Sequence, residues 1–328
     1  MTAMAARMEA TPHTGSAPRI LDLRQLRAAD LAPLLAEERA AWRDVLDWDF
    51  TRSAELVERF VDLHALHGHA LVYGGETLGY TYFVREDHKG LIGDLFLRAS
   101  ARTPDNERLL LERVLESLAA TRVKRVESQL MMVDSLRHPT GAAARHLTTF
   151  DRNFMVLEMP AEALPPGRPR RRFFVERWAD PYQDSAAHLI AAAYAGHVDS
   201  RINDQYRSAA GARRFLSNIV QYPGCGTFFG PASYAAFDAG TGRICGVSLA
   251  SLVSASCGHI TQICVLPEVR GSGVGYELLR HSLHSLGEHG YRRASLTVTA
   301  SNHEAMALYE RVGFRTVRQF SAYVWETG

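Results

Sequence analysis

Lysine and cysteine are scarce in this chain of 328 residues, and long apolar runs are absent. Lys89 and Lys124 are the only lysines, so arginine carries nearly all of the positive charge. The formal net charge of +1 argues against a general nucleic-acid or membrane binder. No window has the length and apolarity of a transmembrane helix. The hydrophobic content of 46% is nevertheless enough for well-packed cores, so we expect a protein that folds in water.

The four cysteines form no Cys-x-x-Cys pair, so neither a metal site nor a disulfide framework is expected; they are Cys225, Cys245, Cys257 and Cys264. Reduced thiols are the default in the cytoplasm, which is the location that we expect. Residues 1–18 lack the apolar core of a signal peptide, and we interpret them as a disordered tail.

The most informative stretch is residues 262–275, where an apolar strand leads into a basic and then glycine-rich turn. An amphipathic helix follows, with leucines at helical spacing. Gly271, Gly273 and Gly275 allow backbone N–H groups to approach a ligand closely, and the dipole at a helix N-terminus favours an anion. Arg270 adds a positive charge. The stretch therefore predicts a pyrophosphate cradle at the end of a strand.

Two common phosphate motifs do not fit this turn. A Walker loop ends in Gly-Lys-Ser/Thr, which is missing here. The dinucleotide fingerprint is Gly-x-Gly-x-x-Gly in a first βαβ unit, whereas this turn reads Gly-x-Gly-x-Gly and lies late in the chain. A glycine-rich start of a helix without any ligand remains the alternative interpretation.

A second motif follows at residues 302–314, after a predicted strand at 293–299. Ser301 or Asn302 can cap a helix that has Glu304 in its first turn. Gly313 suits the left-handed residue that ends such a helix. The order of strand, glycine turn, helix, strand, capped helix and Gly-Phe is specific.

Both motifs resemble signatures of the GNAT acetyltransferase superfamily. Residues 270–275 match Gln/Arg-x-x-Gly-x-Gly/Ala, and residues 302–314 match Asn-x-x-Ala-x-x-x-Tyr-x-x-x-Gly-Phe. The resemblance implies an α/β (α+β) fold and acetyl-CoA as co-substrate, with no metal. It also implies contacts to CoA from Cys264, Val265, Leu266, Arg270, Gly271, Ser272, Gly273, Val274, Gly275, Tyr276, Asn302 and Tyr309.

The chain divides at residues 161–172, which are rich in proline and then in arginine. We interpret them as a solvated linker, with an arginine clamp for CoA phosphates or for an acidic partner as the alternative. Residues 19–160 and 173–328 share an order of elements, which suggests a duplication with Leu97 and Leu266 as equivalent strand ends. We expect each half to be a mixed, mostly antiparallel sheet flanked by helices. The arrangement resembles tandem GNAT proteins, a group that includes mycothiol synthases.

The N-terminal half lacks the cradle. Its equivalent turn, residues 98–107, contains no glycine and places Asp105 and Glu107 at the start of the next helix. These carboxylates would repel a pyrophosphate. We therefore expect a degenerate copy that is structural or contacts substrate, with a modified CoA site as the alternative.

The resemblance implies that the backbone N–H of Val265 donates to the developing oxyanion and that Tyr309 protonates the departing thiolate. Core packing is the alternative role for Tyr309. His259 is a candidate general base, because a period of two places it on the same face as Val265. A histidine at a strand end, hydrogen-bonded at the surface, is the alternative. Gln262 has the opposite parity and is expected to face the other side.

Residues 194–206 form a connector rich in polar and aromatic groups. There we expect Asp199 and Asp204 to hold a cationic amine, His197 to be an alternative base and Tyr206 to line the site, although an ordinary solvated loop remains open. The expected activity is acyl-CoA-dependent N-acyl transfer, most simply of acetyl, to a small-molecule amine or a peptide N-terminus. A non-catalytic acyl-CoA-binding or regulatory module is the alternative.

Overall fold

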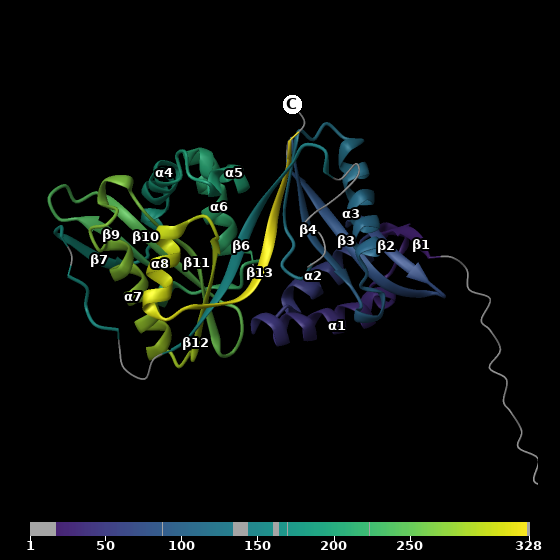
Figure 1. Ribbon diagram of the computed structural model, residues 1–328, viewed down its shortest axis with the longest axis horizontal. Coiled ribbons are helices and arrows are strands. Elements are labelled where there is room, and N and C mark those ends of the chain that lie inside the picture. Colours follow the sequence, from purple (N-terminus) through teal and green to yellow (C-terminus); the bar gives the residue numbers. More distant parts are fainter. Residues whose placement is uncertain are drawn as a thin grey trace, which may run out of the picture.

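The computed structural model describes residues 18–86, 88–133, 144–159, 164–168, 170–222 and 224–326 (Figure 1). The predicted tail therefore lies outside the described residues except for Pro18. Within the described ranges the strands form a continuous sheet of 13 strands that runs through both halves of the chain. In those same ranges, each helix is too short or too polar to cross a membrane.

The N-terminal half begins with a strand and two helices and continues with three antiparallel strands. A helix and a strand parallel to the third of these follow. The elements are β1 (Arg19–Asp22), α1 (Ala28–Leu46), α2 (Thr51–Asp62), β2 (His67–Tyr73), β3 (Glu76–Glu86), β4 (Lys89–Leu97), α3 (Pro104–Ala119) and β5 (Arg125–Gln129).

The C-terminal half repeats this order after β6 (Leu147–Glu158), a long strand that precedes the linker. Its elements are β7 (Phe173–Arg177), α4 (Gln183–Ala193), α5 (Asp199–Ile202), η6 (Asp204–Arg207), α6 (Ala209–Gln221), β8 (Thr227–Phe228), β9 (Tyr234–Asp238), β10 (Ile244–Leu252), β11 (Cys257–Val265), α7 (Val274–Glu288), β12 (Arg293–Thr299), α8 (His303–Val312) and β13 (Arg315–Glu326).

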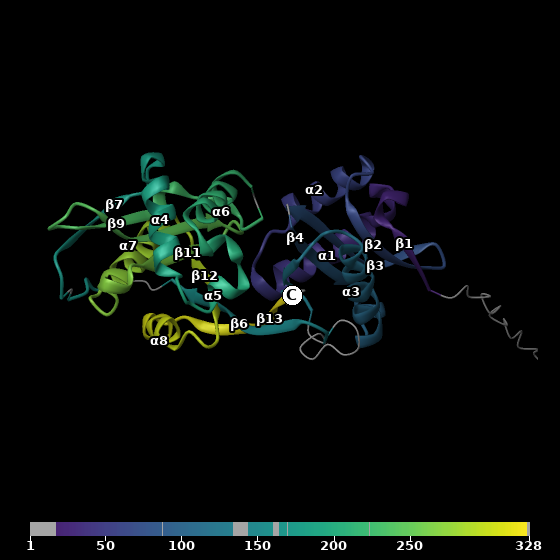
Figure 2. The same ribbon diagram turned by 90° about the horizontal axis from the view of Figure 1, so that it is seen from above.

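Two long strands join the halves. β6 and β13 pair with each other from Arg315 opposite Val156 to Trp325 opposite Leu147. β6 also pairs with β12 of the second half, and β13 pairs with β5 of the first half. Figures 1 and 2 show both strands between the two groups of helices. The last strand of each half therefore extends the sheet of the other half.

The two halves share details beyond element order. β4 pairs in parallel with β5, and β11 pairs in parallel with β12. An irregularity in register skips Gly93 in β4 and Thr261 in β11. β4 ends at Leu97 and β11 ends at Val265, within one residue of the predicted equivalence. These shared features agree with a duplication.

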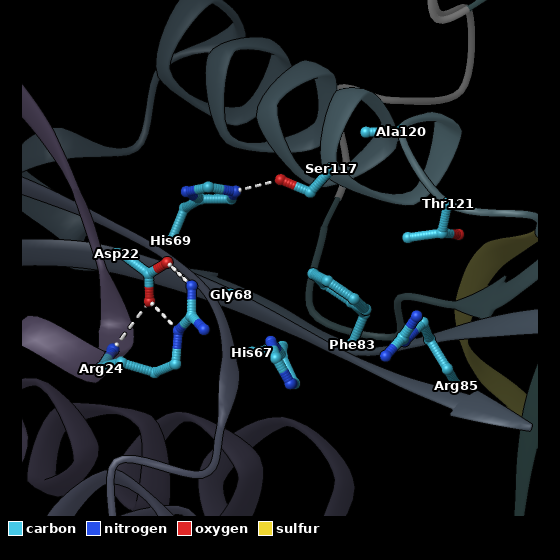
Figure 3. A pocket seen from close by; sticks show the side chains of 10 residues that line it. All are labelled: Asp22, Arg24, His67, Gly68, His69, Phe83, Arg85, Ser117, Ala120 and Thr121. Atoms are coloured by element: carbon cyan, nitrogen blue, oxygen red, sulfur yellow. Dashed lines mark hydrogen bonds and ion pairs between the residues drawn. The ribbon is translucent and has the colours of Figure 1, made fainter.

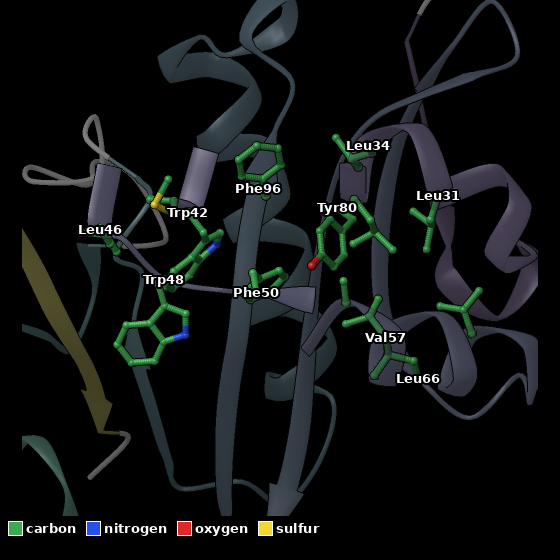
Figure 4. Close-up of a cluster of buried hydrophobic side chains, with 14 of the residues drawn as sticks. Leu31, Leu34, Trp42, Leu46, Trp48, Phe50, Val57, Leu66, Tyr80 and Phe96 are labelled. Atoms are coloured by element: carbon green, nitrogen blue, oxygen red, sulfur yellow. The ribbon is translucent and has the colours of Figure 1, made fainter. Parts of the chain in front are cut away.

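The N-terminal half packs an aromatic core between α1, α2 and the sheet (Figure 4). The Trp42 ring stacks on Phe50 with a centroid separation of 5.0 Å, and Tyr80 and Phe96 are fully buried beside them. Two buried carboxyl groups lie in the same region, and burial raises the pKa of both Glu38 and Asp94. The Tyr80 hydroxyl donates to Glu38 at 2.9 Å. This core also contains Val253, Cys257 and Phe320, so the second half contributes to it.

Candidate active site

The predicted cradle lies between the end of β11 and the first turn of α7. Gly271 has φ = +69° and Gly273 has φ = +96°, which is the left-handed conformation that favours glycine. Gly273 is also the N-cap of α7, and no side chain caps this helix start. The first backbone N–H groups of a helix have no partner within the helix, so they are available to a ligand.

Gly275 lies inside the first turn of α7 and leaves open space. A Cβ atom added there would come no closer than 3.9 Å to another group, the Val265 Cγ1 atom. Glycine in a helix costs about 1 kcal/mol relative to alanine. Packing within the protein does not require this glycine, whereas close approach of a ligand to the backbone would.

The corresponding helix of the N-terminal half starts differently. The Thr103 hydroxyl accepts a hydrogen bond from the Asn106 N–H at 3.2 Å, and Pro104 occupies the first turn. Asp105 and Glu107 add carboxylates to the same turn. The start of α3 is therefore satisfied by its own residues, in contrast to the start of α7.

Arg270 is engaged with the protein. Its guanidinium donates a hydrogen bond of 2.7 Å to the backbone oxygen of Ala193, the last residue of α4. This contact satisfies a carbonyl that the end of the helix leaves unpaired. The side chain thus attaches the glycine turn to α4, in addition to the positive charge that the sequence analysis assigned to it.

The linker packs against the same helix. The Tyr276 hydroxyl donates to the Pro165 oxygen at 2.7 Å, and the Gly167 N–H donates to the Glu277 carboxylate. The Arg170 N–H also donates to the Ser272 oxygen at 3.0 Å. The described part of the linker is therefore attached beside the cradle, while most of its side chains remain exposed to solvent.

β11 and β12 separate next to the cradle. Their parallel pairing ends at Ile260 opposite Leu296, although the strands continue to Val265 and Thr299. The Leu266 N–H donates to the Cys245 oxygen on the β10 side at 2.9 Å. Because neighbouring N–H groups in a strand point to opposite edges, the N–H of Val265 points into the gap between β11 and β12. This is the orientation that an oxyanion donor requires.

His259 does not share a face with Val265, so that prediction is wrong. The pairing of β10 with β11 skips Thr261, and the bulge reverses the alternation of side chains along β11. The His259 ring lies 5.1 Å from Trp48 and 5.8 Å from Phe154, in the core shared with the N-terminal half. Burial lowers the pKa of His259 to about 3. This environment gives no support to a role as general base.

Gln262 faces away from Val265, as its parity predicts, and lies among tyrosines. Its amide nitrogen donates to the Tyr194 hydroxyl at 2.9 Å, and the Tyr206 hydroxyl donates to its amide oxygen at 3.3 Å. The rings of Tyr194 and Tyr206 stack at 4.4 Å. Gln262 and Tyr194 therefore belong to the same cluster as Tyr206. Of these three residues, only Tyr206 was predicted from the sequence to line the site.

Asp199 lies beside this cluster with its charge compensated. It accepts a hydrogen bond from the Thr299 hydroxyl, and its carboxylate is 3.7 Å from Arg152 of β6 and 3.8 Å from His197 Nδ1. The second ring nitrogen of His197 is 3.4 Å from the Asn302 amide nitrogen. Arg152, from the first half, was not predicted to lie in the site, because only the pairing of β6 with β12 brings it here.

Asp204 lies elsewhere. Its carboxylate is 2.6 Å from the ammonium of Lys89, at the start of β4 in the N-terminal half. The expected role in holding a cationic amine is therefore replaced by an ion pair across the two halves.

Tyr309 lies in the core formed by α7, α8 and the sheet and is 7% exposed. Burial raises its pKa, and the nearby negative charge of Asp199 raises it further. Tyr309 therefore keeps its proton at neutral pH and is a potential donor. Asn302 caps α8 by accepting from the Ala305 N–H at 3.3 Å, and Gly313 ends the helix with φ = +110°, as predicted.

A separate cavity of about 340 Å³ opens on the N-terminal half (Figure 3). It is lined by Asp22, Arg24, His67, His69 and Phe83 among others, from β1, β2, β3 and the end of α3. The carboxylate of Asp22 pairs with Arg24 at 2.6 Å. None of the predicted site residues lines this cavity.

Comparison with known proteins identifies the second half. Residues 197–314 match the family model described as the Acetyltransferase (GNAT) family. The C-terminal half is a GNAT domain. It contains both motifs and most of the candidate site residues described above.

Curated relatives are similar to parts of the chain. A mycothiol acetyltransferase of Streptomyces coelicolor is 30% identical over 186 residues, which is 56% of this chain and 54% of that protein. An N-alpha-acetyltransferase of Saccharolobus solfataricus is 36% identical over 67 residues, or 20% of this chain and 40% of that protein. The matches thus span about half or less of the length of these relatives.

Solved structures resemble the whole chain. A GCN5-related N-acetyltransferase from Sphaerobacter thermophilus has a TM-score of 0.67 at 18% identity and covers 97% of both chains. A tandem GNAT protein from the clavulanic acid biosynthesis pathway has a TM-score of 0.59 at 16% identity, over 95% of this chain and 99% of its own. At these identities the likeness concerns the fold, and it supports two GNAT-like halves in tandem.

Proposed function

We propose that the C-terminal GNAT domain transfers the acetyl group of acetyl-CoA to a primary amine by direct attack. The observation that carries the proposal is the uncapped start of α7, which lies beside the gap between β11 and β12. The glycines at 271, 273 and 275 leave the backbone there accessible to a pyrophosphate. Tyr309, a buried and protonated donor, belongs to the same domain.

Each group has a defined part in this reaction. Backbone N–H groups at residues 274–276 bind the pyrophosphate, and the N–H of Val265 stabilises the oxyanion. When bound, acetyl-CoA supplies the thioester carbonyl that the amine attacks. A new C–N bond forms and the C–S bond breaks, and Tyr309 gives its proton to the sulfur. The amine loses a proton to water or to His197, and Tyr309 is reprotonated from solvent.

The paired carboxylates restrict how the acceptor is held. Asp199 is compensated by Arg152 and Thr299, and Asp204 by Lys89. We therefore assign recognition of the acceptor to the neutral cluster of Gln262, Tyr194 and Tyr206. Such groups suit the neutral amine that attack requires. The acceptor class is a small-molecule amine or a peptide N-terminus; two relatives are named N-alpha-acetyltransferase and mycothiol acetyltransferase.

The test is release of free thiol from acetyl-CoA with a panel of amines, comparing the wild type with Tyr309→Phe. The panel contains glucosamine, spermidine and a short peptide with a free α-amino group. We expect kcat to fall by about 100-fold or more in the variant, because the leaving thiolate loses its acid. The dissociation constant of CoA, measured by calorimetry, should change by less than about twofold.

Two results would contradict the proposal in different ways. Wild-type turnover that Tyr309→Phe leaves unchanged would remove Tyr309 from the mechanism. Tight CoA binding without turnover of any amine would favour a non-catalytic acyl-CoA-binding module instead.

A further inference from the structure

The N-terminal half makes a buried ionic contact with the C-terminal half, which we call the seam network: Lys89, Arg125, Glu127 and Asp204. The Lys89 ammonium is 2.6 Å from the Asp204 carboxylate and 3.4 Å from that of Glu127. Arg125 Nε donates to Glu127 at 2.6 Å. Lys89, Arg125 and Glu127 are each no more than 8% exposed, so these charges act on one another with little screening by water.

The seam network also binds backbone groups of the C-terminal half. The Asp204 N–H donates to Glu127 at 3.0 Å. Arg125 Nη2 donates to the backbone oxygen of Arg201 at 2.6 Å and lies 3.3 Å from that of Ile202. These oxygens belong to the end of α5, where carbonyl groups have no partner within the helix. The first half therefore caps α5 and fixes the start of η6.

Two further contacts from β6 reach the same short segment. The Arg201 guanidinium lies over the Phe150 ring, 5.2 Å from its centroid. The Asp199 carboxylate lies 3.7 Å from Arg152. Residues 199–207, which we call the acceptor segment, are thus contacted by β4, β5 and β6 of the first half.

The acceptor segment is too short to hold its own conformation. α5 has 4 residues, as does η6, whereas an isolated helix needs about 12 to 15 residues to be even marginally stable in water. Yet this segment carries Asp199 and Tyr206, which contact Thr299 and Gln262 in the candidate site. Its position must therefore come from tertiary contacts, and the seam network supplies the buried charged ones.

We propose that Lys89, Arg125 and Glu127 are positioning residues for acceptor binding. The N-terminal half has lost the cradle, and it serves the C-terminal site by fixing the acceptor segment against β11 and β12. This inference rests on the proposed function, because it assigns a role in the reaction of that site. It predicts that damage to the seam network weakens use of the amine and leaves binding of acetyl-CoA intact.

The experiment measures KM and kcat for each of the three amine probes, with acetyl-CoA saturating, and then KM for acetyl-CoA. Lys89→Met removes the central charge. We expect KM for the amine to rise about tenfold or more, because a small displacement of binding groups has effects of this size. KM for acetyl-CoA should stay within about twofold, since among the described residues no hydrogen bond or ion pair found joins α7 to the seam network. Lys89→Arg keeps the positive charge, so its KM for the amine should lie much closer to the wild-type value than that of Lys89→Met.

Arg113→Met is the matched control. It also removes a positive charge from the first half, but from an exposed ion pair with Glu116 on α3, at 2.9 Å. Hydrogen exchange gives a second readout: residues 199–207 should exchange faster in Lys89→Met, while residues 274–288 should not. Should Lys89→Met not fold, Asp204→Ala gives the same measurement, because it removes the carboxylate that Lys89 binds in the acceptor segment.

The outcomes separate the two proposals. An amine KM within about twofold of wild type in a folded Lys89→Met or Asp204→Ala variant overturns this inference alone. An equal rise in both KM values overturns it too, since that result describes general loosening of the domain. Absence of wild-type turnover with all three probes overturns the proposed function, and this inference with it.

Discussion

Replacing Gly275 with alanine should strengthen the fold and weaken CoA binding. A Cβ atom at this position would lie 3.9 Å from the Val265 side chain, an ordinary contact, so the protein accommodates it without strain. Alanine in a helix is favoured over glycine by about 0.5–1 kcal/mol, partly because it restricts the unfolded chain. We therefore expect the free energy of unfolding to rise by about 0.5 kcal/mol, the lower end, since Gly275 lies in the first turn.

The effect on the ligand has the opposite sign. A methyl group at residue 275 occupies the space through which a pyrophosphate would reach the backbone N–H groups. Loss of one hydrogen bond to a charged group costs about 1.5–3 kcal/mol, which corresponds to a dissociation constant roughly 10 to 100 times larger. Urea denaturation measures the first effect, and calorimetry with CoA measures the second.

Gly287→Ala provides the control within the same helix. The added Cβ would meet only the end of the Met159 side chain, at 3.4 Å, and position 287 is in the last turn of α7. It should gain similar stability without any change in CoA affinity. If Gly275→Ala binds CoA as tightly as the wild type, the ligand does not approach the backbone at this glycine, and the cradle is not the pyrophosphate site.

Two other perturbations test the shared core. In the His259→Gln variant, the free energy of unfolding should depend less on pH below 6.5 than in the wild type. Burial lowers the pKa of His259 to about 3 from 6.5, so the unfolded chain binds a proton that the folded chain excludes. The wild type should therefore lose up to about 1.4 kcal/mol of stability from this group for each pH unit below 6.5. Urea midpoints measured across that range should fall less steeply with decreasing pH in the variant. Phe154→Ala removes a fully buried ring and should reduce the free energy of unfolding by about 3–5 kcal/mol. Val317→Ala is the control: this side chain is 53% exposed, so its loss should change the free energy of unfolding by no more than about 0.5 kcal/mol. A small loss at Phe154 would show that this core is not tightly packed.

The parts of the fold that were predictable from the sequence have local causes. The glycine turn, the Asn302 cap and the left-handed Gly313 each depend on a few neighbouring residues, and the structure has them as expected. The order of strands and helices followed from periodicity in the same way. The positions of Arg270 and Asp204 were not predictable, because their partners Ala193 and Lys89 are 77 and 115 residues away.

The prediction of the orientation of His259 was wrong for a different reason. Counting by two assumes an unbroken strand, and the bulge at Thr261 adds a residue to β11. Threonine is an ordinary strand residue and gives no warning. Gly93 occupies the equivalent place in β4, and a lone glycine inside a strand is a recognised sign of a bulge. Applying the duplication to this detail would have placed His259 on the face opposite Val265.

The crossing of β6 and β13 also determines the order in which the molecule can be completed. β5 obtains one of its neighbours from residues 322–326, and β12 obtains one from β6, which precedes the second half. During synthesis, one edge of β5 therefore stays unpaired until β13 has been synthesised. An open edge can pair with another chain. Two nascent chains held close together could then exchange β13, so an intertwined dimer is the expected by-product of rapid expression.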